Sequence, residues 1–63
     1  SSVQVVIQVN GKVRARLEMP AGADKSTVQE AALAEANVQR HMTDGSIRKV
    51  IHIPDRLLNI VVA

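Results

Sequence analysis

The chain has 63 residues, of which 46% are hydrophobic, none is aromatic and none is cysteine, and its formal net charge is +2. This length suffices for one small domain, and the lack of cysteine excludes disulfides and Cys-ligated zinc. The lack of aromatic residues excludes base stacking on Phe, Tyr or Trp, so any recognition of nucleic acid must use charge, hydrogen bonds and shape.

The first 20 residues predict a β-hairpin. Apolar residues alternate over 3–9 and indicate a first strand, and Asn10-Gly11 is typical of a type I′ turn. A second strand is predicted from about Lys12 to residue 19, ending at a proline. Within it Lys12, Arg14 and Arg16 stand at every second position, which in a regular strand places all three cations on one face.

A helical segment is predicted to follow a loop. Ser26 is the predicted N-cap, because Gln29 stands three residues later as in a capping box, and the helix is expected to reach residue 35 or 36. Asn37 is predicted to cap a short second helical turn, which "TDG" at 43–45 ends.

Two more strands, over 47–53 and 57–62, flank the turn "IPDR". The predicted fold is therefore a small α+β domain of the order β-β-α-β-β. It has a largely antiparallel four-stranded sheet with one helical segment packed on one face, while the order of the strands in the sheet stays open. Residues 1–63 form a single domain in this prediction.

No catalytic residue and no metal site is predicted. The only candidate bases are His41 and His52, and the three glycines all fall in turns rather than in a phosphate-binding loop. The longest apolar runs have four or five residues, too few to span a bilayer, and nothing looks like a signal peptide, so a cytoplasmic protein without membrane contact is expected.

The cations are unevenly distributed along the chain. They fall in predicted strands and turns, whereas three acids, Asp24, Glu30 and Glu35, fall in the loop and helix. This division predicts a basic sheet face or edge opposite an acidic helix, suited to phosphate groups. The alternative is that such cations merely solvate a half-exposed strand or protect a sheet edge from aggregation.

Three stretches together resemble the C-terminal domain of bacterial leucyl-tRNA synthetase. They are "VIQVNGKVRARL" at 6–17, "AALAEANVQRHM" at 31–42 and "SIRKVIHIPDRLLNIVVA" at 46–63. The resemblance implies a fragment of a larger synthetase, tethered flexibly to the rest of the parent chain, that contacts the corner of tRNA(Leu) where the D and T loops meet. It further implies support for aminoacylation and editing by a parent enzyme that uses ATP and Mg, with no cofactor in this domain.

The predicted RNA-binding residues are those that match the family's motifs or extend its basic surface. They are Asn10, Lys12, Arg14, Arg16, Arg48, Lys49, His52 and Arg56. His52 stands where family members often carry Tyr. The principal alternative is a protein-interaction or structural docking module without direct RNA contact; a small-ligand regulatory domain and an independent enzyme rank lower.

Overall fold

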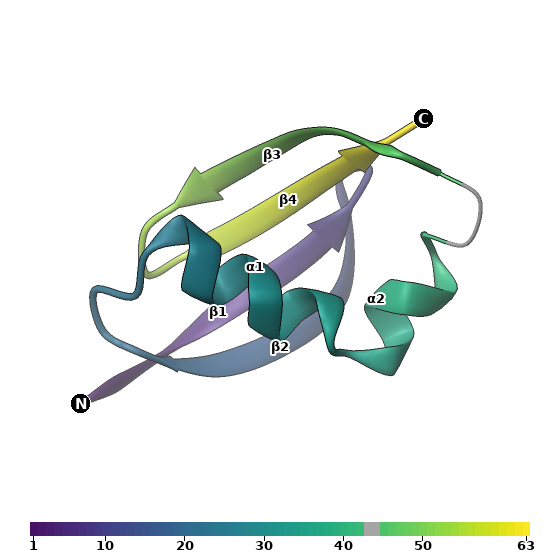
Figure 1. Ribbon diagram of the computed structural model, residues 1–63. Helices are drawn as coiled ribbons and strands as arrows, with labels where there is room; N and C mark the ends of the chain where they lie inside the picture. Colours follow the sequence, from purple (N-terminus) through teal and green to yellow (C-terminus); the bar gives the residue numbers. More distant parts are fainter. Residues whose placement is uncertain (43–44) are drawn as a thin grey trace.

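A computed structural model describes residues 1–42 and 45–63 of the chain. The elements follow the order β1 (Ser2–Val9), β2 (Lys12–Pro20), α1 (Lys25–Leu33), α2 (Ala36–Arg40), β3 (Ile47–Ile53) and β4 (Leu57–Val62). The strands form one sheet in the order β2-β1-β4-β3 (Figure 1).

The sheet is mixed. β1 pairs antiparallel with β2, and β3 pairs antiparallel with β4, but the two central strands β1 and β4 run parallel. The predicted α+β class is confirmed, with one parallel pair at the centre of a largely antiparallel sheet. This arrangement arises because the helical segment carries the chain from one edge strand, β2, to the other, β3.

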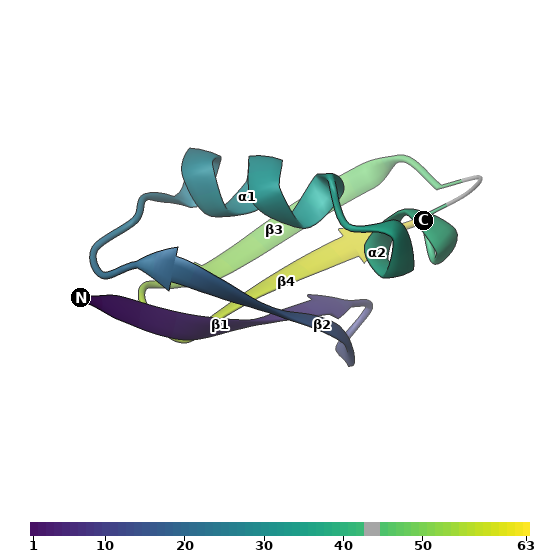
Figure 2. The same ribbon diagram turned by 90° about the horizontal axis from the view of Figure 1, so that it is seen from below.

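Both helices lie on one face of the sheet (Figure 2). Alternate residues of the central strands point to this face, and they meet Val28 and Ala32 of α1, one helical turn apart, and Val38 of α2. The buried core comprises Val5, Ile7, Val9, Met19, Val28, Ala32, Val38, Leu58 and Ile60. The opposite face, called here the open face, carries no helix.

The helix boundaries differ from the predicted ones. Asp24, not Ser26, caps α1: its backbone is extended, and its side chain accepts a hydrogen bond from the Thr27 N–H at 2.8 Å. An Asp is as good an N-cap as a Ser, and Ser26 lies inside the helix, as its second residue. The helical segment is divided after Leu33, and Glu35 rather than Asn37 precedes α2. The predicted "TDG" terminator lies partly outside the described residues.

The predicted hairpin turn is confirmed. Asn10 and Gly11 have φ angles of 52° and 81°, the two positive values that a type I′ turn requires.

Within the described part of the chain, neither α1 nor α2 has the length and apolar character needed to cross a membrane.

Shortening the side chain that anchors α2 should destabilise the domain. Val38 is 0% exposed, and Val38→Ala removes two buried methyl groups. Their loss should lower the free energy of unfolding by about 1.6 kcal/mol, and the cavity left behind should lower it further. Urea unfolding followed by circular dichroism measures the change. Val13→Ala is the matched control, since Val13 is 46% exposed and the same change there should cost less than about 0.5 kcal/mol.

The carboxylate of Asp24, which caps α1, should make the stability of the domain depend on pH below about pH 4. Hydrogen bonds from the Thr27 side chain and backbone hold the pKa of Asp24 below its ordinary value of 3.8, helped by the nearby charge of His52. The stabilisation is therefore present above pH 3.8 and is lost as the pH falls through the lower folded-state pKa.

Asp24→Asn keeps a capping oxygen but does not titrate, so it should flatten this part of the pH–stability curve. Asp24→Ala should lower the midpoint of thermal unfolding at every pH. An Asn variant that keeps the full wild-type slope between pH 2 and 5 would contradict this assignment.

Candidate nucleic-acid interface

A β-bulge in β2 separates the three cations that the sequence places on one face. Ile7 pairs with Ala15 and the next residue of β1, Gln8, pairs with Val13, so Arg14 is the extra residue of the bulge. Residues directly opposite one another share a face of the sheet, and one inserted residue exchanges the faces beyond it. The prediction of a single cationic strand face is therefore wrong.

The bulge sends the neighbouring cations to different faces. Arg16 pairs with Val6 and lies on the open face. Lys12 pairs with Val9, a core residue, and thus lies at the helix-bearing face. The open face receives Val13 in the place where a regular strand would have put a cation.

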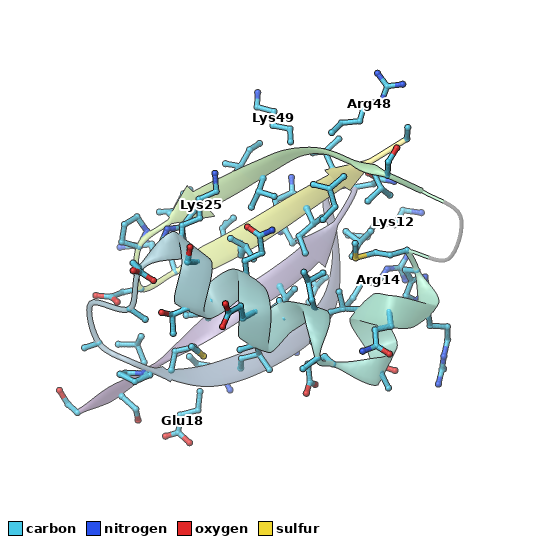
Figure 3. All side chains as sticks on the ribbon, viewed as in Figure 1. Lys12, Arg14, Glu18, Lys25, Arg48 and Lys49 are labelled. Carbon is cyan, nitrogen blue, oxygen red and sulfur yellow. The ribbon has the colours of Figure 1, made fainter. Side chains whose placement is uncertain are left out.

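Cations gather at one end of the molecule instead. Lys12 and Arg14 lie near the β1–β2 turn, and Arg48 lies at the start of β3, on the same end (Figure 3). This placement follows from the register, because Val9 pairs with both Lys12 and Ile60, and Ile47 pairs with Val62. The helix α2, whose last residue is Arg40, also lies at this end and contacts β1 and β2.

We call the surface formed by Lys12, Arg14, Arg40 and Arg48 the basic end. Three of its side chains are exposed, and Arg14 is half-buried. The Arg14 Nε atom is enclosed and has no hydrogen-bond partner. Arg40 was not among the predicted site residues, and the only signal for it in the sequence is a cation in the last turn of a predicted helix.

Three acids lie at the other end of the molecule, where each accepts a hydrogen bond from the domain itself. The Ser2 hydroxyl donates to Glu18 at 2.6 Å, the Thr27 N–H donates to Asp24 at 2.8 Å, and the Gly22 N–H donates to Asp55 at 2.8 Å. We call Glu18, Asp24 and Asp55 the acidic end. The predicted acids Glu30 and Glu35 do lie in the helical layer, within α1 and directly before α2.

The lysine and arginine side chains of the described residues form no such hydrogen bonds within the domain. Among the side-chain hydrogen bonds of the described residues, none uses a Lys or Arg side chain as donor. The three carboxylates of the acidic end therefore help to hold the fold, whereas the cations of the basic end make no such bond within the described residues.

Four predicted site residues are not part of the basic end. Lys49 follows Arg48 at the same end of β3 but pairs with Val61 and lies on the open face, and Arg56 lies in the β3–β4 turn beside the acidic end. His52 pairs with the core residue Leu58, so it lies at the helix-bearing face, half-buried and with an enclosed Nε2 that lacks a partner. The structure does not bring Arg16, His52 or Arg56 together with Lys12, and it places Lys49 at the same end as Lys12 but on the other face of the sheet.

Asn10 has a structural role in the hairpin turn. Its side-chain oxygen accepts a hydrogen bond from the Val62 N–H at 2.9 Å, and its backbone N–H donates to the Ile60 carbonyl at 2.9 Å. Gly11 N–H in turn donates to the Asn59 side chain at 3.0 Å. Three hydrogen bonds therefore join the turn beside Lys12 to β4.

The open face has a partly apolar character. Val13, Ile51 and Ile53 are 46%, 38% and 44% exposed. A shallow hollow beside them is lined by Gln4, Gln8 and Leu57 and the β3–β4 turn. Within residues 1–42 and 45–63, no three His, Asp or Glu side chains are grouped so as to hold a metal ion.

Comparison with known proteins shows that this small α+β unit is similar to a small part of aminoacyl-tRNA synthetases. No protein-family model matches the chain. It is 52% identical over 58 residues to a leucine–tRNA ligase of Nitratidesulfovibrio vulgaris and 53% identical over 60 residues to that of Chromohalobacter salexigens. These matches cover 92% and 95% of the chain but 7% of each relative.

The chain is thus a homologue of a C-terminal piece of leucyl-tRNA synthetases, and the resemblance predicted from the sequence is confirmed. It spans less than a tenth of the length of these relatives.

A solved structure has the same fold. It is the ternary complex of Agrobacterium radiobacter K84 agnB2 LeuRS with tRNA and LeuAMS, and it superposes with a TM-score of 0.90 at 22% identity. The match covers 98% of this chain and 8% of that one. The mixed sheet and its helical layer therefore recur in a synthetase of distant sequence.

Removing the Asn10 side chain should weaken the fold. Asn10→Gly keeps a residue that tolerates positive φ but leaves the Val62 N–H without its acceptor, which should cost about 1 kcal/mol of unfolding free energy. Chemical denaturation measures this. Asn37→Gly serves as a comparison, because Asn37 makes no side-chain hydrogen bond within the described residues; it should show only the helix-propensity cost. An unchanged stability of Asn10→Gly would refute the structural role.

Proposed function

We propose that this chain is a tRNA-binding module of a leucyl-tRNA synthetase and catalyses no reaction itself. Its RNA partner in this proposal is tRNA(Leu), contacted at the outer corner where the D and T loops meet. The observation that carries the proposal is the basic end, whose cations donate none of the side-chain hydrogen bonds found among residues 1–42 and 45–63. Homology to leucine–tRNA ligases supplies the kind of RNA.

Recognition in this proposal works through the RNA backbone and its shape. Arg and Lys side chains bind phosphate oxygens through charge-assisted hydrogen bonds, and such contacts position a protein on RNA without reading its sequence. The chain has no aromatic residue, so stacking of unpaired bases on aromatic rings contributes nothing. A module of this kind holds the tRNA and leaves its identity to be read by other parts of the synthetase.

The parent enzyme supplies the rest of the function. Leucylation, its ATP and Mg, and editing belong to the parts of the synthetase outside this chain. A flexible tether raises the effective concentration of the module near bound tRNA, so weak contacts suffice. This role places the protein in the cytoplasm, where tRNA is charged.

Binding to tRNA should weaken steeply as salt is added. If about four to six phosphates are neutralised, the logarithm of the association constant should fall with the logarithm of salt concentration with a slope of roughly −3 to −5. Titration of the 63-residue chain with tRNA(Leu) at several KCl concentrations measures the slope. An association constant that does not change with salt would exclude phosphate contact as the basis of binding.

A docking module without direct RNA contact is the second candidate function. The exposed Ile51 and Ile53, which are neighbours on the open face of β3, favour it, because adjacent exposed apolar side chains are typical of protein interfaces. Its partner in that case is the body of the synthetase or another protein.

Reversing charge at the β1–β2 hairpin distinguishes the two candidates. Lys12→Glu/Arg14→Glu should abolish detectable tRNA binding, since two attractive contacts become repulsive, whereas docking through the open face should survive. Ile51→Ser/Ile53→Ser is the converse variant and should spare RNA binding. Loss of tRNA binding in the isoleucine variant alone would favour the open face as the interface.

A further inference from the structure

We infer that the basic end alone contacts the RNA backbone, that Arg40 is one of its contacts, and that Arg16 and Arg56 are not. This inference rests on the proposed function of tRNA binding. It assigns that function to one end of the molecule rather than to a face of the sheet, and it adds a residue from the helical layer.

Three separate parts of the fold converge on this surface. Lys12 and Arg14 come from edge strand β2, and Arg48 comes from the opposite edge strand β3 (Figure 3). Arg40 is the last residue of α2, which lies on one face of the sheet (Figure 2). The two edge strands are three strand spacings apart, about 14 Å at the usual 4.8 Å per strand. The surface is therefore wide enough to contact several phosphates of one RNA backbone.

Two of the cations are held in place by the fold. Arg14 is half-buried at the bulge with its Nε enclosed, so its side chain has fewer conformations to lose when it binds. Arg40 follows Val38, which is 0% exposed and anchors α2 on the sheet. The C-terminal end of a helix also favours a cation electrostatically.

Arg16 and Arg56 each have an acid beside them. Arg16 and Glu18 lie on the same face of β2, since they pair with Val6 and Gln4 of β1. Arg56 follows Asp55 directly in the β3–β4 turn. A neighbouring carboxylate offsets part of the attraction of each arginine for a phosphate, so the acidic end and its surroundings are poor places for RNA.

The experiment compares two variants of the 63-residue chain that lose the same charge. Lys12→Gln/Arg40→Gln removes two positive charges from the basic end, and Arg16→Gln/Arg56→Gln removes two from elsewhere. All four side chains are exposed, so neither variant disturbs the core. Each is titrated with tRNA(Leu) over a range of KCl concentrations, and its amide chemical shifts are compared with those of the unaltered chain.

The basic-end variant should bind at least about tenfold more weakly, as expected for the loss of hydrogen bonds between charged groups. Its salt slope should become shallower by about 1.4 to 1.8, because each lost phosphate contact removes roughly 0.7 to 0.9. The Arg16/Arg56 variant should stay within about twofold of the unaltered chain and keep its slope. Amide shift changes on adding tRNA to the unaltered chain should centre on 10–14, 38–41 and 47–49.

Equal losses in the two variants, or shift changes centred on the open face, would overturn this inference and leave the proposed function intact. A failure of the unaltered chain to bind tRNA would overturn both. If either variant fails to fold, the shift map of the unaltered chain decides the question by itself.

Discussion

The parallel pairing of β1 with β4 is the constraint on which the rest of the structure depends. Hydrogen bonds from Val6 N–H to the Arg56 carbonyl and from Asn10 N–H to the Ile60 carbonyl, each 2.9 Å, bracket this pair. It places the two most apolar strands at the centre of the sheet, where a helical layer covers them. It also aligns the two hairpins, so that the turn after β1 and the start of β3 meet at one end.

This alignment explains how a weakly charged chain acquires a strongly polarised surface. The net charge is only +2, yet the three acids that accept internal hydrogen bonds lie at one end, whereas four of the eight lysine and arginine residues form the basic end. Such a separation produces a local field much larger than the net charge suggests, which is how a small basic domain attracts an RNA backbone. The open face, where apolar and amide side chains mix, remains a separate surface with a different chemistry.

Turn residues and strand alternation predicted most of the fold, because turns and strands depend mainly on residues that are neighbours in the sequence. The Asn10-Gly11 turn requires two positive φ angles, which these residues tolerate, and the strands over 47–53 and 57–62 follow from alternation and the proline between them. The helix start was misplaced by two residues because Asp24 and Ser26 are both competent caps. What separates them in the structure is the backbone: Asp24 is extended and its side chain accepts the Thr27 N–H, whereas Ser26 already lies within α1.

The sequence by itself determined the class of fold, its four strands and helical layer, its hairpin turn and its kinship with a piece of leucyl-tRNA synthetases. Only the tertiary structure decided the strand order, the parallel central pair and the place of each cation. The reason is that one inserted residue at Arg14 exchanges the faces of β2, and a bulge depends on how two strands pair. Spacing along one strand therefore predicted a cationic face, whereas the assembled sheet and α2 produce a cationic end.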